Sequence, residues 1–160
     1  MKITALQEYG MRCLLQLAES GTGQPIQIRA IAAREGLSQD YVGKILTRLR
    51  RSGVVKSVRG LKGGYVLSKT PSEISVGSTL LALSEKPVQM THLKRDLCGQ
   101  FPGNRRECIH LRGCNVRQLW TMVILKVYGG LNRIPLSDLI GSEEEVFQNL
   151  SKKEEEVAVS

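Results

Sequence analysis

The stretch from residue 27 to residue 67 limits the possible folds most, because two short amphipathic helices separated by one glycine turn are followed directly by a hairpin. Residues 28–35 carry apolar side chains at helical spacing, and Gly36, which can adopt positive φ, ends this helix. Ser38 can cap a second helix over residues 39–52. The apolar face of this second helix comprises Val42, Ile45, Leu46 and Leu49. This order of elements predicts a helix-turn-helix.

A short basic hairpin follows the second helix. Residues 54–58 and 65–67 have the composition of strands, and the glycine-rich segment 59–64 between them carries Arg59 and Lys62. A helix-turn-helix with a basic hairpin behind it has the shape needed to contact duplex DNA. The sequence therefore predicts a mainly α fold with a small β wing, a winged helix-turn-helix domain, joined to a long C-terminal dimerisation helix.

Positive charge is concentrated in the same stretch. The whole chain has 23 Lys and Arg against 15 Asp and Glu, a formal net charge of +8. Residues 27–70 hold ten basic and two acidic side chains, an excess of eight, so the rest of the chain is neutral on balance. A basic patch confined to one module is typical of proteins that bind phosphate backbones. The alternative, a solvated basic face on an ordinary helical domain, leaves the order of the elements unexplained.

The chain divides by composition into four parts. Residues 1–83 are expected to form the winged helix-turn-helix domain, which opens with a helix that starts at a capping box on Thr4. Residues 84–114 lack an apolar period and are expected to form a long loop. Residues 115–141 predict a long dimerisation helix and a last turn, and residues 142–160 predict a flexible tail because they are acidic and then mixed in charge.

The predicted long helix is apolar over a broad arc, wider than one small domain can cover, which favours packing against a second copy of the chain. No apolar run reaches the ~18 residues of a membrane span, and the N-terminus lacks a signal-peptide pattern. We therefore expect a cytoplasmic homodimer that does not enter a membrane. No general base stands beside a nucleophile and no cofactor loop precedes a helix, so an enzyme is not expected.

Three of the four cysteines, Cys98, Cys108 and Cys114, fall in or at the end of the polar loop. Thiolates favour zinc or an iron–sulfur cluster, but this spacing matches neither a paired Cys-x-x-Cys zinc site nor a ferredoxin run. Three cysteines leave a fourth position open for His110, His92 or a carboxylate from elsewhere. The alternative is three unligated thiols. The fourth cysteine, Cys13, lies among apolar residues and is expected to be a core side chain.

The motifs together resemble the Rrf-two family of bacterial transcription regulators, which includes IscR-, NsrR- and RirA-like members. The likeness covers about residues 1–140. It is carried by Glu-Tyr-Gly-Met-Arg at 8–12, Val-Arg-Gly-Leu-Lys-Gly-Gly-Tyr at 58–65, the three-cysteine loop, and Cys-Asn-Val-Arg-Gln-Leu-Trp at 114–120. The resemblance implies a homodimer whose long helices cross, with each recognition helix in the major groove of palindromic double-stranded DNA and each wing in the minor groove. In many members an iron–sulfur cluster held by the loop cysteines controls DNA binding.

Carried over to this chain, the resemblance makes Cys98, Cys108 and Cys114 cluster ligands. IscR-like members have a histidine three residues after the last cysteine, where this chain has Arg117, which cannot act as a ligand. In NsrR-like members the fourth ligand resembles a carboxylate from the first helix of the partner subunit. Glu8 occupies that place in this chain, so the resemblance makes Glu8 from the partner subunit the fourth ligand. This ligand set favours [4Fe-4S] over [2Fe-2S].

The predicted DNA contacts are polar and basic residues of the two helices and the wing. The resemblance implies groove contacts for Ser38, Tyr41 and Lys44 and a minor-groove contact for Arg59. The full predicted set is Arg29, Ser38, Gln39, Tyr41, Lys44, Arg48, Arg50, Arg59 and Lys62. IscR-like members carry an acidic residue on the recognition helix where this chain has Gly43, so their operator sequence is not expected here.

The sequence therefore predicts a sequence-specific DNA-binding transcriptional regulator, a repressor, controlled by a labile iron–sulfur cluster that senses iron, redox state or nitric oxide. The alternative is a winged-helix regulator with a structural zinc site or direct thiol sensing and no cluster.

Overall fold

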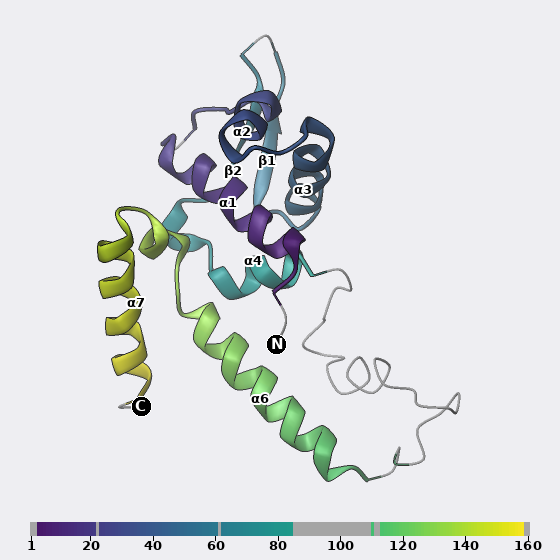
Figure 1. Cartoon of the computed structure of the whole chain (residues 1–160), viewed down its shortest axis with the longest axis vertical. Helices are drawn as coiled ribbons and strands as arrows, with labels where there is room; N and C mark the ends of the chain where they lie inside the picture. The colour runs from purple at the N-terminus through teal and green to yellow at the C-terminus, as the bar shows by residue number, and fades with distance from the viewer. Residues whose placement is uncertain (1–2, 22, 61, 85–109, 111–112, 159–160) are drawn as a thin grey trace.

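The computed structural model describes residues 3–21, 23–60, 62–84, 110 and 113–158 (Figure 1). The described residues up to 67 form three helices, α1 (Ala5–Glu19), α2 (Ile28–Glu35) and α3 (Gln39–Arg51), followed by strands β1 (Val55–Val58) and β2 (Gly64–Leu67). The strands pair antiparallel in one two-stranded sheet. The predicted mainly α fold with a small β wing is confirmed.

The helix ends are determined by local sequence. The predicted capping box is present at α1, where the Thr4 hydroxyl accepts from the Gln7 amide (3.3 Å) and the Gln7 side chain accepts from the Thr4 amide (3.1 Å). Helix α2 ends at Gly36 with φ of 65°, a left-handed conformation that a side chain would disfavour. The Ser38 hydroxyl accepts from the Tyr41 amide (3.2 Å) and so begins α3, as predicted.

One apolar core joins the three helices to the wing. It contains Cys13 and Leu14 of α1 and Ile31 of α2, all fully buried. The predicted apolar face of α3 is fully buried in the same core and consists of Val42, Ile45, Leu46 and Leu49. Since this face of α3 is covered, its polar faces remain on the surface of the domain.

The elements after the wing are two short 3-10 helices, a short helix and two longer helices. In chain order they are η1 (Pro71–Glu73), α4 (Val76–Ala82), α6 (Asn115–Asn132), η3 (Leu136–Leu139) and α7 (Glu143–Ala158). Helix α6 packs on α4 and projects away from the winged helix-turn-helix, while α7 packs on η3 (Figure 1).

The prediction of a flexible tail over residues 142–160 is wrong, because most of this segment is helix α7. A capping box also begins this helix: Glu145 accepts from the Ser142 amide (2.8 Å), and the Ser142 hydroxyl accepts from the Glu145 amide (3.3 Å). These hydrogen bonds lower the pKa of Glu145, so its carboxylate stays charged beside the helix N-terminus. The Asn149 side chain donates to the Asp138 carbonyl of η3 (3.5 Å). The Ser-x-x-Glu pattern was the sequence signal for this helix.

We predict that Leu46→Ala lowers the free energy of unfolding by about 2–5 kcal/mol, because it leaves a cavity in the fully buried face of α3. Urea denaturation followed by circular dichroism measures the change. Arg50→Ala, on the exposed side of the same helix, is the control and should change stability little. Equal stabilities for the two variants would contradict the position of Leu46 in the core.

Candidate nucleic-acid interface and cysteine site

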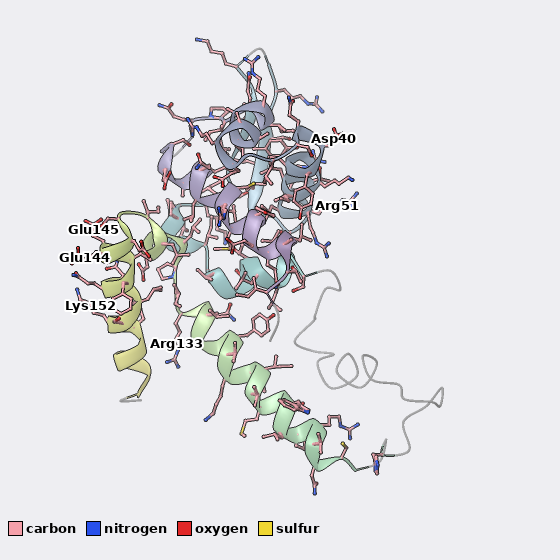
Figure 2. The ribbon with its side chains drawn as sticks, in the orientation of Figure 1. Asp40, Arg51, Arg133, Glu144, Glu145 and Lys152 are labelled. Carbon is pink, nitrogen blue, oxygen red and sulfur yellow. The ribbon has the colours of Figure 1, made fainter. Side chains whose placement is uncertain are left out.

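The outer side of α3 presents polar and basic side chains to solvent. Ser38 and Gln39 are exposed at its N-terminal end, and Lys44 and Arg50 are exposed farther along. Figure 2 shows Asp40 and Arg51 near the two ends of this helix, on the outside of the domain. Recognition helices of this kind contact base edges with residues near their N-terminus, so Ser38 and Gln39 have a suitable position.

The wing carries two further predicted contacts at its tip. Arg59 and Lys62 are exposed on the connection between β1 and β2. The turn is tight: Gly60 has φ of 115°, and the Gly63 amide donates to the Gly60 carbonyl (2.9 Å). A Cβ atom at Gly63 would lie 2.8 Å from the Gly60 oxygen, so the tip tolerates no side chain there. Glycine thus allows a narrow tip that still carries two cations.

A backbone bridge that the sequence did not reveal holds the wing in place. Ile26 pairs with Tyr65 of β2, with amide-to-carbonyl distances of 3.0 and 2.9 Å in the two directions. A Cβ atom at Gly64 would lie 3.0 Å from the Gln27 amide nitrogen, so this close approach requires glycine. The wing is therefore attached directly to the segment that enters α2, where Arg29 is exposed.

Two predicted DNA contacts are half-buried and have partners inside the protein. The Tyr41 ring meets the Tyr9 ring edge to face, with centroids 6.0 Å apart. The Arg48 guanidinium donates from Nε to the Ala82 carbonyl (3.0 Å) and from Nη2 to the Ser84 carbonyl. DNA contact by Tyr41 and Arg48 stays a prediction, and the structure gives Arg48 an internal role.

Of the three cysteines predicted as cluster ligands, only Cys114 falls within the described residues, and it lies at the N-terminus of α6. It is half-buried, and its Sγ accepts from the Arg117 amide (3.3 Å) as the helix cap. Cysteine sulfur is the usual ligand of an iron–sulfur cluster, so a half-buried Sγ at this position suits that role. Cys98, Cys108 and His92 lie outside the described residues, and His110 is exposed. Among the residues that the structure describes, no three potential metal ligands converge.

Glu8, the predicted fourth ligand, is exposed to solvent. It lies on the surface of α1, where its carboxylate forms a salt bridge with Arg12 (2.8 Å), and both side chains are about half exposed. An exposed salt bridge of this kind contributes little to stability, so the Glu8 carboxylate can leave Arg12 for another partner at little cost. Because a thiolate and an accessible carboxylate are both anionic ligands, Cys114 and Glu8 are compatible with an iron–sulfur cluster.

An exposed apolar surface covers α6. The helix projects from the domain, and seven of its apolar side chains are between 37% and 59% exposed. These residues are Val116, Leu119, Trp120, Met122, Val123, Leu125 and Val127. Large contiguous apolar patches on a soluble domain mark interaction sites. Packing of this helix against a second copy of the chain stays a prediction.

Cys13 has the opposite environment from Cys114. It is fully buried in α1, as predicted for a core residue. Burial, assisted by the charge of Glu35, raises the pKa of its thiol to about 12. Since the thiolate is the form that binds metals and reacts, Cys13 is excluded from both roles at neutral pH.

The helix-turn-helix buries its apolar face and exposes the polar face of its second helix, and a narrow basic wing lies beside it. These features define a winged-helix DNA-binding regulator of transcription. Residues 3–142 match the family model for Rrf2, described as iron-dependent transcriptional regulators. The chain belongs to this Rrf2 family, the Rrf-two family of the sequence resemblance. Within the described part of the chain, every helix is too short or too polar to span a lipid bilayer.

Known relatives agree with this assignment. The chain is 33% identical over 140 residues to Protein rrf2 of Nitratidesulfovibrio vulgaris, covering 88% of this chain and 87% of the relative. It is 31% identical over 144 residues to the HTH-type transcriptional regulator IscR of Serratia proteamaculans, covering 90% and 82%.

Solved structures show the same architecture. The structure of T. potens IscR matches with a TM-score of 0.64 and 26% identity, covering 88% of this chain and 86% of that one. The global cysteine regulator CymR of B. subtilis matches with a TM-score of 0.64 and 28% identity, covering 87% and 95%.

We predict that iodoacetamide leaves Cys13 unmodified in the native protein at neutral pH, because its buried thiol stays protonated below a pKa of about 12. Mass spectrometry of the digested protein measures alkylation at each cysteine. The same reaction in urea is the control and should modify Cys13 fully. Rapid native alkylation of Cys13 would show that the core opens at α1.

Proposed function

We propose that this transcriptional regulator is a homodimeric repressor that binds palindromic double-stranded DNA, and that an iron–sulfur cluster controls this binding. The observation that carries the proposal is the exposed face formed by α3 and the wing, where nearly all predicted DNA contacts lie in one module. A protein that binds chromosomal DNA in this way acts in the bacterial cytoplasm.

The dimensions of α3 and the wing suit the two DNA grooves. The B-DNA major groove admits one α-helix, and α3 can enter with Ser38 and Gln39 near the base edges. Lys44, Arg50 and Lys62 are placed to neutralise phosphates, which sets register without reading sequence. Arg59 at the narrow wing tip can enter the minor groove, whose negative potential attracts arginine.

The apolar surface of α6 supports the proposed homodimer. Val116, Leu119, Trp120, Val123 and Val127 recur at helical spacing and form one stripe along the helix. An isologous pairing of two such stripes would bury both at once. Two recognition helices held in this way can read half-sites about one helical turn, ~34 Å, apart.

The cluster would be held by Cys98, Cys108, Cys114 and the partner subunit's Glu8, with [4Fe-4S] favoured over [2Fe-2S]. A bound cluster supplies a redox-active centre that iron limitation, oxidants or nitric oxide can destroy. A carboxylate is a hard ligand for such a centre, which makes the site labile. Because Cys114 caps α6, a change at its sulfur acts at the start of the helix that carries the apolar stripe.

A second candidate is direct thiol sensing without a cluster, or a structural zinc site formed by the three cysteines and His110. The observation that favours thiol sensing is the similarity to the solved structure of the oxidized form of Staphylococcus aureus CymR, with 28% identity and a TM-score of 0.63. Purification without oxygen, followed by visible absorption and assays of iron, sulfide and zinc, separates these candidates.

We predict that Cys108→Ala removes the visible absorption and iron of the anaerobically purified protein and changes its affinity for DNA. The physical reason is that two remaining thiolates and a carboxylate cannot retain the cluster. Cys13→Ala is the matched control and should keep the absorption, since Cys13 is buried in the core. A Cys108→Ala protein with wild-type colour and DNA affinity would exclude the cluster switch.

We predict that Arg59→Ala weakens DNA binding and makes the slope of log K against log salt less steep, by about 0.9 for each phosphate that is no longer neutralised. Fluorescence anisotropy at several salt concentrations measures both quantities. Lys69→Ala removes an exposed cation beyond the end of β2 and is the control. An unchanged affinity and slope for Arg59→Ala would exclude Arg59 from the interface.

A further inference from the structure

Helix α4 contacts both the helix that projects from the domain and the helix that presents the DNA-binding residues. It packs against α6, against α3 and against α1. Its N-terminal end meets α6, and its C-terminal end meets α3 and α1 (Figure 1). A helix of seven residues with partners at both ends can transmit the orientation of one long helix to another.

The joint with α6 is close and specific. The Ser75 hydroxyl donates to the side-chain oxygen of Asn132, the last residue of α6 (3.1 Å), and the Val76 amide donates to the carbonyl group of Ile134, two residues beyond that helix (2.9 Å). A Cβ atom at Gly77 would lie 2.8 Å from the Asn132 amide nitrogen, a backbone atom that cannot move aside. Glycine at position 77 therefore determines how closely the two helices approach.

The joint with α3 is formed by Arg48. The last carbonyl groups of a helix lack intrahelical partners, and the helix end carries a partial negative charge. The Arg48 guanidinium donates to the carbonyl group of Ala82, the last residue of α4, and to that of Ser84, two residues beyond the helix. The Gln7 side chain of α1 donates to a third, that of Leu80 (3.2 Å).

We infer that α4 fixes the angle between α3 and α6, and that Arg48 is a positioning residue through which the protein sets its preferred spacing of DNA half-sites. The inference rests on the proposed function, since it requires a dimer formed by α6. Arg48 acts here through the carbonyl groups at the end of α4 and not by contact with DNA.

The length of α6 makes the spacing sensitive to this angle. An 18-residue helix is about 27 Å long at 1.5 Å per residue. A rotation of roughly 7° at the α4 end moves the far end by about 3.4 Å, the rise of one base pair. A small change at either joint therefore shifts the far end of α6 relative to α3 by an amount comparable to one base-pair step.

The test uses a palindromic duplex that the full-length wild-type protein selects from a random-sequence library, and derivatives with one base pair inserted or removed at its centre. Affinities are measured by fluorescence anisotropy at several salt concentrations. The spacer ratio, the affinity for the selected duplex divided by that for an altered spacer, reports positioning. The salt slope reports the number of neutralised phosphates.

For Arg48→Ala we expect the spacer ratio to fall by roughly 2- to 30-fold, the range for residues that change coupling between sites, with an unchanged salt slope. Arg50→Ala is the matched control, because Arg50 is exposed on the same helix. It should make the slope less steep by about 0.9 per phosphate that Arg50 neutralises and keep the spacer ratio. If Arg48→Ala changes the slope and keeps the ratio, Arg48 is a phosphate contact and the inference is overturned.

Two further variants make the test independent of any folding defect in Arg48→Ala. Arg48→Lys keeps the positive charge but cannot bridge both carbonyl groups with the arginine fork, so the spacer ratio should also fall. Gly77→Ala should also lower the spacer ratio, because its added Cβ disturbs the joint between α4 and α6. Gly129→Ala is the control and should keep the ratio, since nothing lies within 4 Å of its added Cβ. Wild-type ratios in folded Arg48→Lys and Gly77→Ala proteins would overturn the inference.

The wild-type protein separates the inference from the proposed function. If it selects a duplex but binds all spacers equally, only the inference is overturned. If it selects no duplex at all, the proposed DNA binding fails and the inference fails with it.

Discussion

The burial of one face of α3 against α1 and α2 is the interaction on which the rest of the structure depends. Ile45, Leu46 and Leu49 are fully buried, so the helix cannot rotate without bringing them into water. Rotation is thus prevented by the hydrophobic effect, and the polar face of α3 points outward as a consequence. The same core includes Val55 at the base of the wing, so the position of the wing relative to α3 is fixed by shared packing.

Backbone hydrogen bonds hold in place the elements that the apolar core does not fix by itself. The Ile26 bridge to Tyr65 attaches the wing, and the Val76 bond to Ile134 attaches the segment after α6. Glycine is needed at both places, because the approaching backbone leaves no room for a Cβ atom at Gly64 or at position 77. The winged helix-turn-helix and α6 therefore form a connected frame, in which orientation is transmitted by close packing and hydrogen bonds.

The elements that the sequence predicted correctly have signals within a few residues. Ser38 caps α3 and Gly36 ends α2, because capping and left-handed φ are local properties of single residues. Residues 142–160 differ from the prediction because high charge alone is typical of a flexible tail, whereas the Ser142 and Glu145 capping box begins a helix there. The internal role of Arg48 had no such signal, since an arginine on the polar side of a basic helix is also typical of a phosphate contact.

The sequence by itself determined the class of the protein: two helices joined by a glycine turn, a basic wing, and a family whose model matches residues 3–142. Helical periodicity, caps and charge are encoded locally, so they can be recognised without coordinates. Only the tertiary structure decided which cations face solvent and which face other helices. Arg48 and Arg50 are two residues apart, yet one closes the end of α4 and the other is exposed, because the packing of α4 against α3 is a long-range contact.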